Sequence, residues 1–214
     1  MSDRLNLSDH PITRLKLTTL RNKETPNETF RTALHELSVI LVSEAVQRLG
    51  RVLKIVQRPV ETPLGQADGF YLESKVVLVP ILRAGLGMLE AGKLFFSDAE
   101  VCPIGLRRDE KTFEITCYRE VIPSEPPDIA IILDPMIATG ASGVVAINLV
   151  KKWKARHIVY VAVLAAPFGI SQIHTAHEDV PIFLGKLDRG LNDKNYIVPG
   201  LGDAGDRQFG QPTH

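Results

Sequence analysis

The sequence has little cysteine, no excess charge of either sign and no long apolar run. Its two cysteines, Cys102 and Cys117, cannot by themselves supply a disulfide framework or a four-ligand zinc site. Lysine plus arginine number 25, as do aspartate plus glutamate, and this balance disfavours gripping nucleic acid or an anionic membrane. Neither a signal peptide nor a run near the ~20 apolar residues of a bilayer span is visible. We therefore expect a cytoplasmic protein with no nucleic-acid or membrane partner.

What is present is enough apolar material for one sizeable core. Hydrophobic residues make up 44% of the 214 and charged residues 23%, which is ordinary globular usage. No internal repeat, low-complexity tract or long linker divides the chain. We expect one domain over residues 1–214, with a core at about 70–190, an N-terminal helix over 25–50 and a glycine-rich cap over 190–210.

The expected N-terminal helix has a well-marked start and end. Thr25 is the predicted N-cap, Pro26 the first helical residue and Glu28 the acid three residues after the cap. Apolar residues then recur every three or four positions, which predicts one buried stripe. Gly50 suits the C-terminal end.

Short apolar runs separated by helical stretches follow from residue 75. Residues 76–79, 129–133 and 158–164 are rich in Val, Ile and Leu, and a weaker run covers 182–184. Continuous runs of this kind predict strands buried on both faces, as in parallel sheets. Helical spacing over 142–153 places a helix between two of them. The sequence therefore predicts an α/β fold with right-handed crossovers.

One further segment does not fit this sheet. Phe113, Ile115 and Cys117 alternate with polar neighbours, and prolines over 123–127 end the segment. This pattern predicts a hairpin arm over 112–127 that projects from the body. We interpret its apolar residues as a contact between two copies of the chain.

The segment Asp134-Pro-Met-Ile-Ala-Thr139-Gly140-Ala-Ser142 follows a predicted buried strand and enters a predicted helix. Such a small-residue loop directs N–H groups and a helix dipole at a phosphate. Thr139 and Ser142 add hydroxyl donors, and Asp134 can hold ribose hydroxyls or help position a magnesium ion. The segment is not a Walker loop, because the Gly-Lys-Ser/Thr ending of that motif is absent. The competing interpretation is an ordinary turn with Ser142 as the N-cap.

Arginines stand near two further predicted strand ends. Arg83 lies in a turn with two glycines, and its planar fork suits phosphate oxygens. Arg108 forms a second basic site with Arg107. Each alone is typical of a solvated surface. Two arginine sites beside a phosphate loop favour a ligand that carries several phosphate charges.

Residues 200–205 satisfy the pattern G-x-G-x-x-G, but too few residues follow to complete a dinucleotide-binding βαβ unit. What remains is a glycine-rich segment whose backbone groups can read the edge of a small planar base. Asp203 within it can face a metal or an anionic co-substrate.

Two histidines, His174 and His177, have the spacing of one helical face. A metal pair is conceivable, but no third ligand is recognisable nearby, and a pair on a helix surface is the favoured interpretation. The sequence contains no G-x-S-x-G nucleophile elbow, so it gives no support to catalysis by a serine nucleophile.

Four motifs stand in one order along the chain. They are VPILRAGLG at 79–87, RDE at 108–110, DPMIATGAS at 134–142 and YIVPGLGDAGDR at 196–207. With them the sequence resembles the uracil phosphoribosyltransferase family across nearly its whole length. The resemblance implies a type I phosphoribosyltransferase fold, in which flanking helices, a β-arm and a C-terminal base-binding hood accompany a parallel sheet. It also implies that uracil and 5-phospho-α-D-ribose 1-diphosphate (PRPP) give UMP and diphosphate, with Mg²⁺.

Site residues follow from the same resemblance. Those implied to be catalytic are Arg83, Arg108, Asp134 and Asp203. Those implied to bind PRPP are Arg83, Arg108, Asp134, Pro135, Met136, Ile137, Ala138, Thr139, Gly140, Ala141, Ser142 and Asp203. Those implied to bind uracil, largely through backbone atoms, are Ile197, Gly202, Asp203 and Ala204. No side chain is expected to hold Mg²⁺ directly, because PRPP and water carry most of its ligands.

Three residues, Arg107, Cys117 and Ala141, depart from the family pattern and bear on rate and affinity more than on the reaction. A homodimer or higher homo-oligomer is a further expectation, and allosteric control by GTP is left open. The alternative function is a non-catalytic, nucleotide-sensing RNA-binding regulator on the same fold. The even charge count does not favour the basic face that such a regulator needs.

Overall fold

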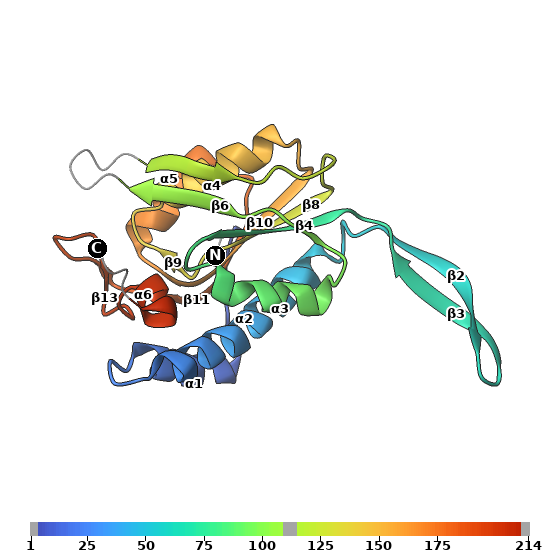
Figure 1. Cartoon of the computed structure of the whole chain (residues 1–214), viewed down its shortest axis with the longest axis horizontal. Coiled ribbons are helices and arrows are strands. Elements are labelled where there is room, and N and C mark those ends of the chain that lie inside the picture. Colours follow the sequence, from blue (N-terminus) through green and yellow to red (C-terminus); the bar gives the residue numbers. More distant parts are fainter. Residues whose placement is uncertain (1–3, 109–114, 211–214) are drawn as a thin grey trace.

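The computed structural model describes residues 4–108 and 115–210, without the side chain of Arg108. Its centre is a sheet with the strand order β1-β11-β10-β8-β4-β6-β7 (Figure 1). These strands are β1 Leu5–Leu7, β4 Val76–Leu82, β6 Ile104–Arg108, β7 Ile115–Glu120, β8 Ile129–Leu133, β10 His157–Ala165 and β11 Ile182–Leu187. Two short strands, β5 Glu100–Val101 and β9 Met136–Ile137, pair with β4 and β10. Neighbours run parallel except β6 and β7, so the expected parallel sheet is confirmed.

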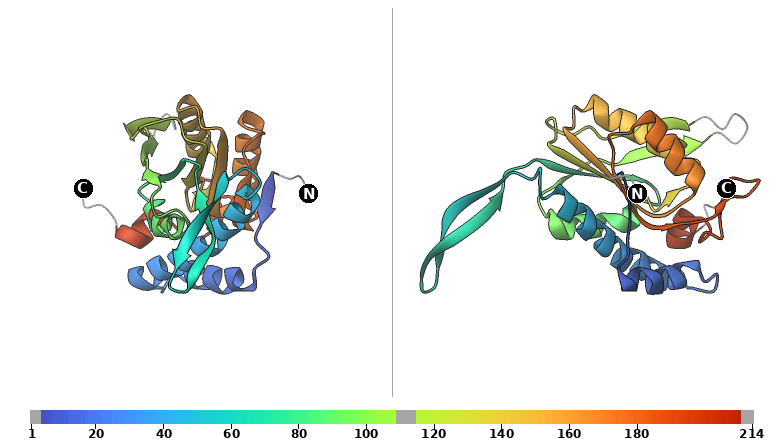
Figure 2. Two further views of the ribbon diagram at one scale, coloured as in Figure 1. Left: turned by 90° about the vertical axis from the view of Figure 1, so that its right-hand side faces the viewer. Right: turned by 180° about the vertical axis from the view of Figure 1, so that it is seen from behind.

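Helices cover both faces of this sheet (Figures 1 and 2). One face carries α1 Pro11–Arg21, α2 Asn27–Leu49 and α3 Leu86–Phe95. The other carries α4 Ala141–Lys152 and α5 Pro167–Ala176. The described helices include none with the length and apolar character needed to cross a membrane.

Alternation along each strand supplies two hydrophobic cores. In β8, Ile131 and Leu133 pack with side chains of α1, α2 and α3, whereas Ala130 and Ile132 pack with those of α4 and α5. Successive side chains of a strand point to opposite faces. A strand covered on both faces therefore needs an apolar residue at every position, which explains the continuous runs in the sequence.

The start of α2 corrects the predicted N-cap and first helical residue by one position each. Asn27 is its first residue and Pro26 occupies the N-cap position, so Thr25 lies before the helix. The Thr25 hydroxyl donates to the carbonyl oxygen of Thr19 at 2.7 Å and thus binds the end of α1. The predicted end is confirmed, because Gly50 is the C-cap residue.

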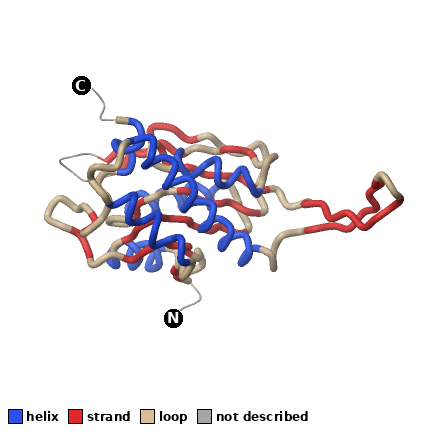
Figure 3. Tube along the Cα trace, turned by 90° about the horizontal axis from the view of Figure 1, so that it is seen from below, coloured by secondary structure: helices blue, strands red, loops and turns tan. Residues whose placement is uncertain are grey.

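The projecting arm is not where the sequence predicts it. β2 Ile55–Thr62 and β3 Gly65–Leu72 pair antiparallel and extend from the body as a two-stranded hairpin (Figure 3). The segment predicted as an arm instead supplies β7, which pairs with β6 at the edge of the main sheet. Phe113 lies outside the described residues. An edge strand and a free hairpin both alternate polar with apolar residues, so the pattern did not separate them.

The glycine-rich C-terminal segment, the predicted cap, is more regular than the sequence suggests. β12 Gly190–Leu191 and β13 Ile197–Val198 pair antiparallel, and α6 Ala204–Phe209 follows. Arg21 of α1 donates to both carboxylate oxygens of Asp188, at 2.9 and 2.5 Å. Asp188 also accepts from the backbone N–H of Gly200 at 2.9 Å. The cap is therefore tied to α1 through one carboxylate.

Candidate active site

A cleft of about 540 Å³ lies at the carboxyl edge of the sheet. The carboxyl ends of parallel strands meet at one edge, and the turns after β4 and β8 both open into this cleft. Arg83 enters from the first turn, Asp134 and Ser142 from the second, and Asp203 from the start of α6. Met136 also lines the cleft, so five of the predicted site residues, from three separate parts of the sequence, are brought together.

Arg83 is half-exposed and directs its guanidinium toward the cap. Its Nη2 lies 3.2 Å from Oδ1 of Asp206, in the first turn of α6. The turn that carries Arg83 packs tightly on the neighbouring strand, because a Cβ added to Gly85 would lie 2.3 Å from the Leu133 carbonyl oxygen. Glycine is therefore required at 85 for the two turns to approach each other.

Asp134 is the buried acid of the cleft. Its Oδ2 accepts a hydrogen bond from the hydroxyl of Tyr160, on β10, at 2.8 Å. Burial raises the pKa of Asp134 to about 6, whereas the hydrogen bonds from Tyr160 and from the Met136 backbone oppose that rise. Both protonation states of this carboxyl are therefore accessible near neutral pH.

A smaller hollow of about 130 Å³ adjoins Asp134 where β8 leads into α4. Met136, Ile137, Ala138, Thr139, Gly140 and Ser142 line it. Gly140, with φ of 82°, is the N-cap of α4, so the competing interpretation of Ser142 as N-cap is wrong. The first turn of α4 leaves backbone N–H groups without partners inside the helix, and these favour an anion. The hollow has the size and chemistry for one phosphate group.

Two residues of the predicted loop lie outside the lining of this hollow. Pro135 accepts backbone hydrogen bonds from Val163 and Leu164, and so anchors the loop on β10. Ala141 is the first residue of α4. Both shape the loop through its backbone.

The residues predicted to bind uracil differ in burial and in whether they line the cleft. Asp203 is the N-cap of α6, accepts from the Asp206 N–H at 2.9 Å and lines the cleft. Ile197 and Ala204 are buried in the cap, and Gly202 is exposed with φ of 81°. These three are outside the described lining, although Gly205 belongs to it.

Arg108 is the last residue of β6, and its backbone pairs with Ile115 of β7. Its side chain, and the neighbouring Asp109 and Glu110, lie outside the described residues. Arg107, which departs from the family pattern, lines the cleft. Its guanidinium lies 5.9 Å from the ring centre of Tyr118, which belongs to the same wall.

Sequence reasoning missed three polar residues of the site: Tyr160, Tyr118 and Asp206. Tyr160 carries the one polar side chain among the buried residues of β10. That single polar position in an apolar run is all that the sequence offers to point to it. Tyr118 stands in the segment predicted as an arm. Asp206 lies within a quoted motif, but only the fold brings it to Arg83.

The histidine pair gives no metal site in the described part of the chain. His174 belongs to α5, whereas His177 is its C-cap and contacts the carbonyl oxygen of Val144 at 3.4 Å. Burial lowers the pKa of both imidazoles, aided by Arg4 and Lys151 respectively. No group of three or more His, Cys, Asp or Glu among the described residues is arranged to hold a metal ion.

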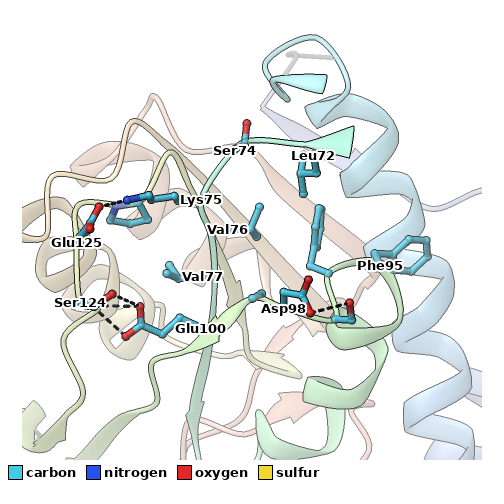
Figure 4. A pocket seen from close by; sticks show the side chains of 14 residues that line it. Leu72, Ser74, Lys75, Val76, Val77, Phe95, Asp98, Glu100, Ser124 and Glu125 are labelled. Atoms are coloured by element: carbon cyan, nitrogen blue, oxygen red, sulfur yellow. Dashed lines mark hydrogen bonds and ion pairs between the residues drawn. The ribbon is translucent and has the colours of Figure 1, made fainter. Parts of the chain in front are cut away.

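A second hollow, of about 460 Å³, lies at the opposite end of β4 beside the base of the arm (Figure 4). Its wall combines Phe95 and Leu72 with an ion pair between Lys75 and Glu125. Glu100 accepts from the backbone N–H and hydroxyl of Ser124. None of the predicted site residues lines it.

Comparison with known proteins shows the family of this chain. The family model described as uracil phosphoribosyltransferase matches residues 7–211. A uracil phosphoribosyltransferase of Roseiflexus castenholzii is 43% identical over 205 residues, which cover 95% of this chain and 97% of that protein. One from Leifsonia xyli is 44% identical, covering 97% and 99%.

A solved structure agrees over the whole fold. The AQ2163 protein from Aquifex aeolicus superposes with a TM-score of 0.90 at 36% identity, covering 98% of this chain and 100% of that one. The mainly parallel sheet with helices on both faces is the type I phosphoribosyltransferase fold. The family model and these relatives span nearly the full length, and the chain belongs to the uracil phosphoribosyltransferase family.

Proposed function

We infer that this chain is an enzyme that transfers the phosphoribosyl group of PRPP to N1 of uracil, giving UMP and diphosphate in pyrimidine salvage. The observation that carries the inference is the cleft in which Arg83, Asp134 and Asp203 meet beside the hollow over α4. Family membership supplies the reaction. The relatives from Roseiflexus castenholzii and Leifsonia xyli are named as this transferase, which gives no support to an RNA-binding regulator.

We propose that the loop 135–142 holds the 5′-phosphate of PRPP. Two observations support this proposal. The hollow of about 130 Å³ lies at the start of α4, where backbone N–H groups have no partner inside the helix, and Thr139 and Ser142 line it. A doubly charged phosphate at this position interacts favourably with the helix dipole. Asp134 borders both this hollow and the cleft, so its carboxylate is placed to accept hydrogen bonds from ribose hydroxyls.

The diphosphate end is assigned to Arg83 and Arg108, with Asp203 at its border. Arginine donates in a planar fork and remains charged, which suits phosphate oxygens as negative charge builds on the leaving group. The transition state of glycosyl transfer resembles an oxocarbenium ion. Cations beside the departing diphosphate therefore lower the barrier, and no covalent nucleophile is required.

Mg²⁺ is the proposed cofactor, in keeping with the general use of this ion by phosphoribosyltransferases. We propose that oxygens of PRPP and water supply most of its ligands, since Mg²⁺ prefers oxygen donors and usually keeps several waters. Asp203 and Asp206 are the carboxylates of the cap that border the cleft. When bound, Mg²⁺ neutralises charge on the diphosphate.

The uracil site is assigned to Ile197, Gly202, Asp203 and Ala204. Uracil presents a carbonyl–imide–carbonyl edge that backbone N–H and C=O groups can match. Cytosine would leave some of these groups without partners, and an unpaired polar group in a closed site is costly. The cap then aligns uracil N1 with the anomeric carbon of PRPP.

A direct assay tests the reaction. Purified protein with Mg²⁺, PRPP and radiolabelled uracil is expected to form labelled UMP, and a panel of bases measures the preference for uracil. A folded protein that gives no UMP, beside an active control transferase, would defeat the assignment. Adding GTP to the same assay tests allosteric activation.

Assembly as a homodimer, or a higher homo-oligomer, is part of this proposal. The arm of β2 and β3 supports it, because Leu64 and Phe70 leave 100% and 70% of their surface exposed. Apolar surface on a projecting hairpin is typical of an interface. Light scattering that gives the mass of one chain would refute the assembly. A cytoplasmic location stays a prediction.

A further inference from the structure

Tyr160 is a buried polar residue in the middle of the sheet. Its strand, β10, is otherwise apolar from Ile158 to Ala165, and the Tyr160 side chain is fully buried. Burying a hydroxyl costs free energy unless it finds a hydrogen-bond partner. Within residues 4–108 and 115–210, the one hydrogen-bond partner of this hydroxyl is Oδ2 of Asp134, at 2.8 Å.

The phenol reaches that carboxyl from beneath the start of α4. Tyr160 lines the small hollow together with Gly143, and a Cβ at Gly143 would lie 3.2 Å from the ring atom Cε2 of Tyr160. The absence of a side chain at 143 thus makes room for the ring. Tyr160 sits below the proposed phosphate loop and does not line the larger cleft.

Asp134 is held on both of its oxygens. Oδ2 accepts from Tyr160, and Oδ1 lies 3.5 Å from the backbone N–H of Met136, a longer and weaker contact. The backbone N–H of Asp134 donates to Val161 on β10 at 3.2 Å. The short bond from Tyr160 is therefore the main restraint on the orientation of the carboxyl group.

We propose that Tyr160 is a positioning residue for phosphoribosyl transfer, whose hydroxyl fixes the Asp134 carboxyl in the orientation that receives the ribose hydroxyls of PRPP. This rests on the proposed function, in which Asp134 binds the ribose. Tyr160 has no contact with substrate in this arrangement and acts through Asp134. Its loss therefore weakens PRPP binding and leaves the uracil site intact.

The test compares Tyr160→Phe with Tyr71→Phe, each of which removes one phenolic oxygen. Tyr71 lies on the arm, in β3, and serves as the matched control. We expect Tyr160→Phe to raise the KM for PRPP about tenfold, the scale of one charge-assisted hydrogen bond. The KM for uracil should stay within twofold, and Tyr71→Phe should match the wild type. Circular dichroism and thermal melting check that both variants are folded.

A double-mutant cycle with Asp134→Ala separates this proposal from the one on which it rests. Dissociation constants for PRPP are measured by calorimetry, with Mg²⁺ present and uracil absent, for both single variants and the double variant. If Tyr160 acts through Asp134, then Tyr160→Phe adds no further loss once Asp134 is alanine.

Each other outcome overturns a defined step. Full, additive loss in the double variant would show that Tyr160 acts independently of Asp134. Unchanged PRPP affinity and unchanged KM in a folded Tyr160→Phe variant would remove its positioning role while leaving Asp134 in place. Unchanged affinity in Asp134→Ala would instead refute the ribose-binding role of Asp134, and the positioning role with it.

Discussion

The guanidinium of Arg83 and the carboxylate of Asp206 lie 3.2 Å apart, so the turn after β4 and the first turn of α6 are joined by an ion pair at the cleft. Their side chains are 45% and 31% exposed. An exposed pair of this kind contributes only about 0–1 kcal/mol to stability. Its position beside the proposed diphosphate site makes its effect on binding the more informative one.

Replacing Asp206 by Asn should strengthen PRPP binding. The change removes a negative charge that faces a polyanion and competes for Arg83. We expect the dissociation constant to fall about two- to fivefold at low salt, with the gain shrinking as salt screens it. Calorimetry at two salt concentrations measures this. Asp179→Asn is the matched control, because Asp179 pairs with Lys151 away from the cleft.

Arg83→Ala should act in the opposite direction and raise the same dissociation constant at least tenfold, since a charge-assisted contact to phosphate is lost. If Asp206→Asn weakens binding as strongly as Arg83→Ala does, Asp206 orients Arg83 and does not compete for it. That result would reverse our interpretation of the ion pair.

Asp134 should make the free protein less stable as pH rises from about 4 to 7. Its folded pKa of about 6 lies above the ordinary value of 3.8, so the folded state binds this proton more tightly than the unfolded state. The stabilisation is complete below the unfolded pKa and is lost as pH rises through the folded one. Across that window the group accounts for about 3 kcal/mol.

The measurement is urea unfolding of the wild type and of Asp134→Asn at pH 4.5 and pH 7.5. The difference in unfolding free energy, variant minus wild type, should increase toward pH 7.5. Other titrating groups are common to both proteins and cancel in that difference. A difference that is independent of pH would place the pKa of Asp134 near its ordinary value.

Much of the fold could be predicted because a strand that is buried on both faces is apolar at every position, and such a run is visible in the sequence. The runs at 129–133 and 158–164 must be apolar at every position, and each predicts a central strand. The arm at 55–72 has no such run. Its residues from Ile55 to Leu72 are mostly exposed, so neither face of the hairpin is covered by the part of the chain that the structure describes.

Site residues that directly follow a buried strand could be predicted from the sequence. Site residues that reach the cleft only through the packing of distant elements could not. Asp134 and Arg83 could be placed because each follows a buried run. Tyr160 stands 26 residues after Asp134 and reads as a core residue, because only the pairing of β8 with β10 brings the two together. The roles of Ile197, Gly202 and Ala204 came from the resemblance and remain predictions.

Gly140→Ala should damage the phosphate loop specifically. Gly140 has φ of 82°, and an added Cβ would lie 2.5 Å from the Gly169 carbonyl oxygen. We expect a loss of about 2 kcal/mol or more in stability and a large rise in the KM for PRPP. Gly190→Ala is the control, because a Cβ there meets nothing within 4 Å. Equal melting temperatures for the two variants would show that the loop tolerates a side chain.

Gln208 should couple the cap to the turn that carries Arg83. It is fully buried in α6, and its Nε2 donates to the carbonyl oxygens of Ala84, at 3.0 Å, and Ala204, at 2.8 Å. Its amide also fills the space beside Gly87, where an added Cβ would collide with Oε1 of Gln208. This side chain therefore joins the cap to the turn that carries Arg83, in addition to the Arg83–Asp206 ion pair.

Gln208→Ala leaves a cavity and removes the donor from two carbonyl groups, so we expect a loss of about 2–4 kcal/mol in unfolding free energy. We also expect the KM of both substrates to rise, when measured well below the melting temperature, because the cap and the Arg83 turn are no longer held together. Gln66→Ala on the exposed arm is the matched control. A lower melting temperature with both KM values unchanged would reduce Gln208 to a purely structural residue, since coupling requires that binding of uracil and PRPP weaken together.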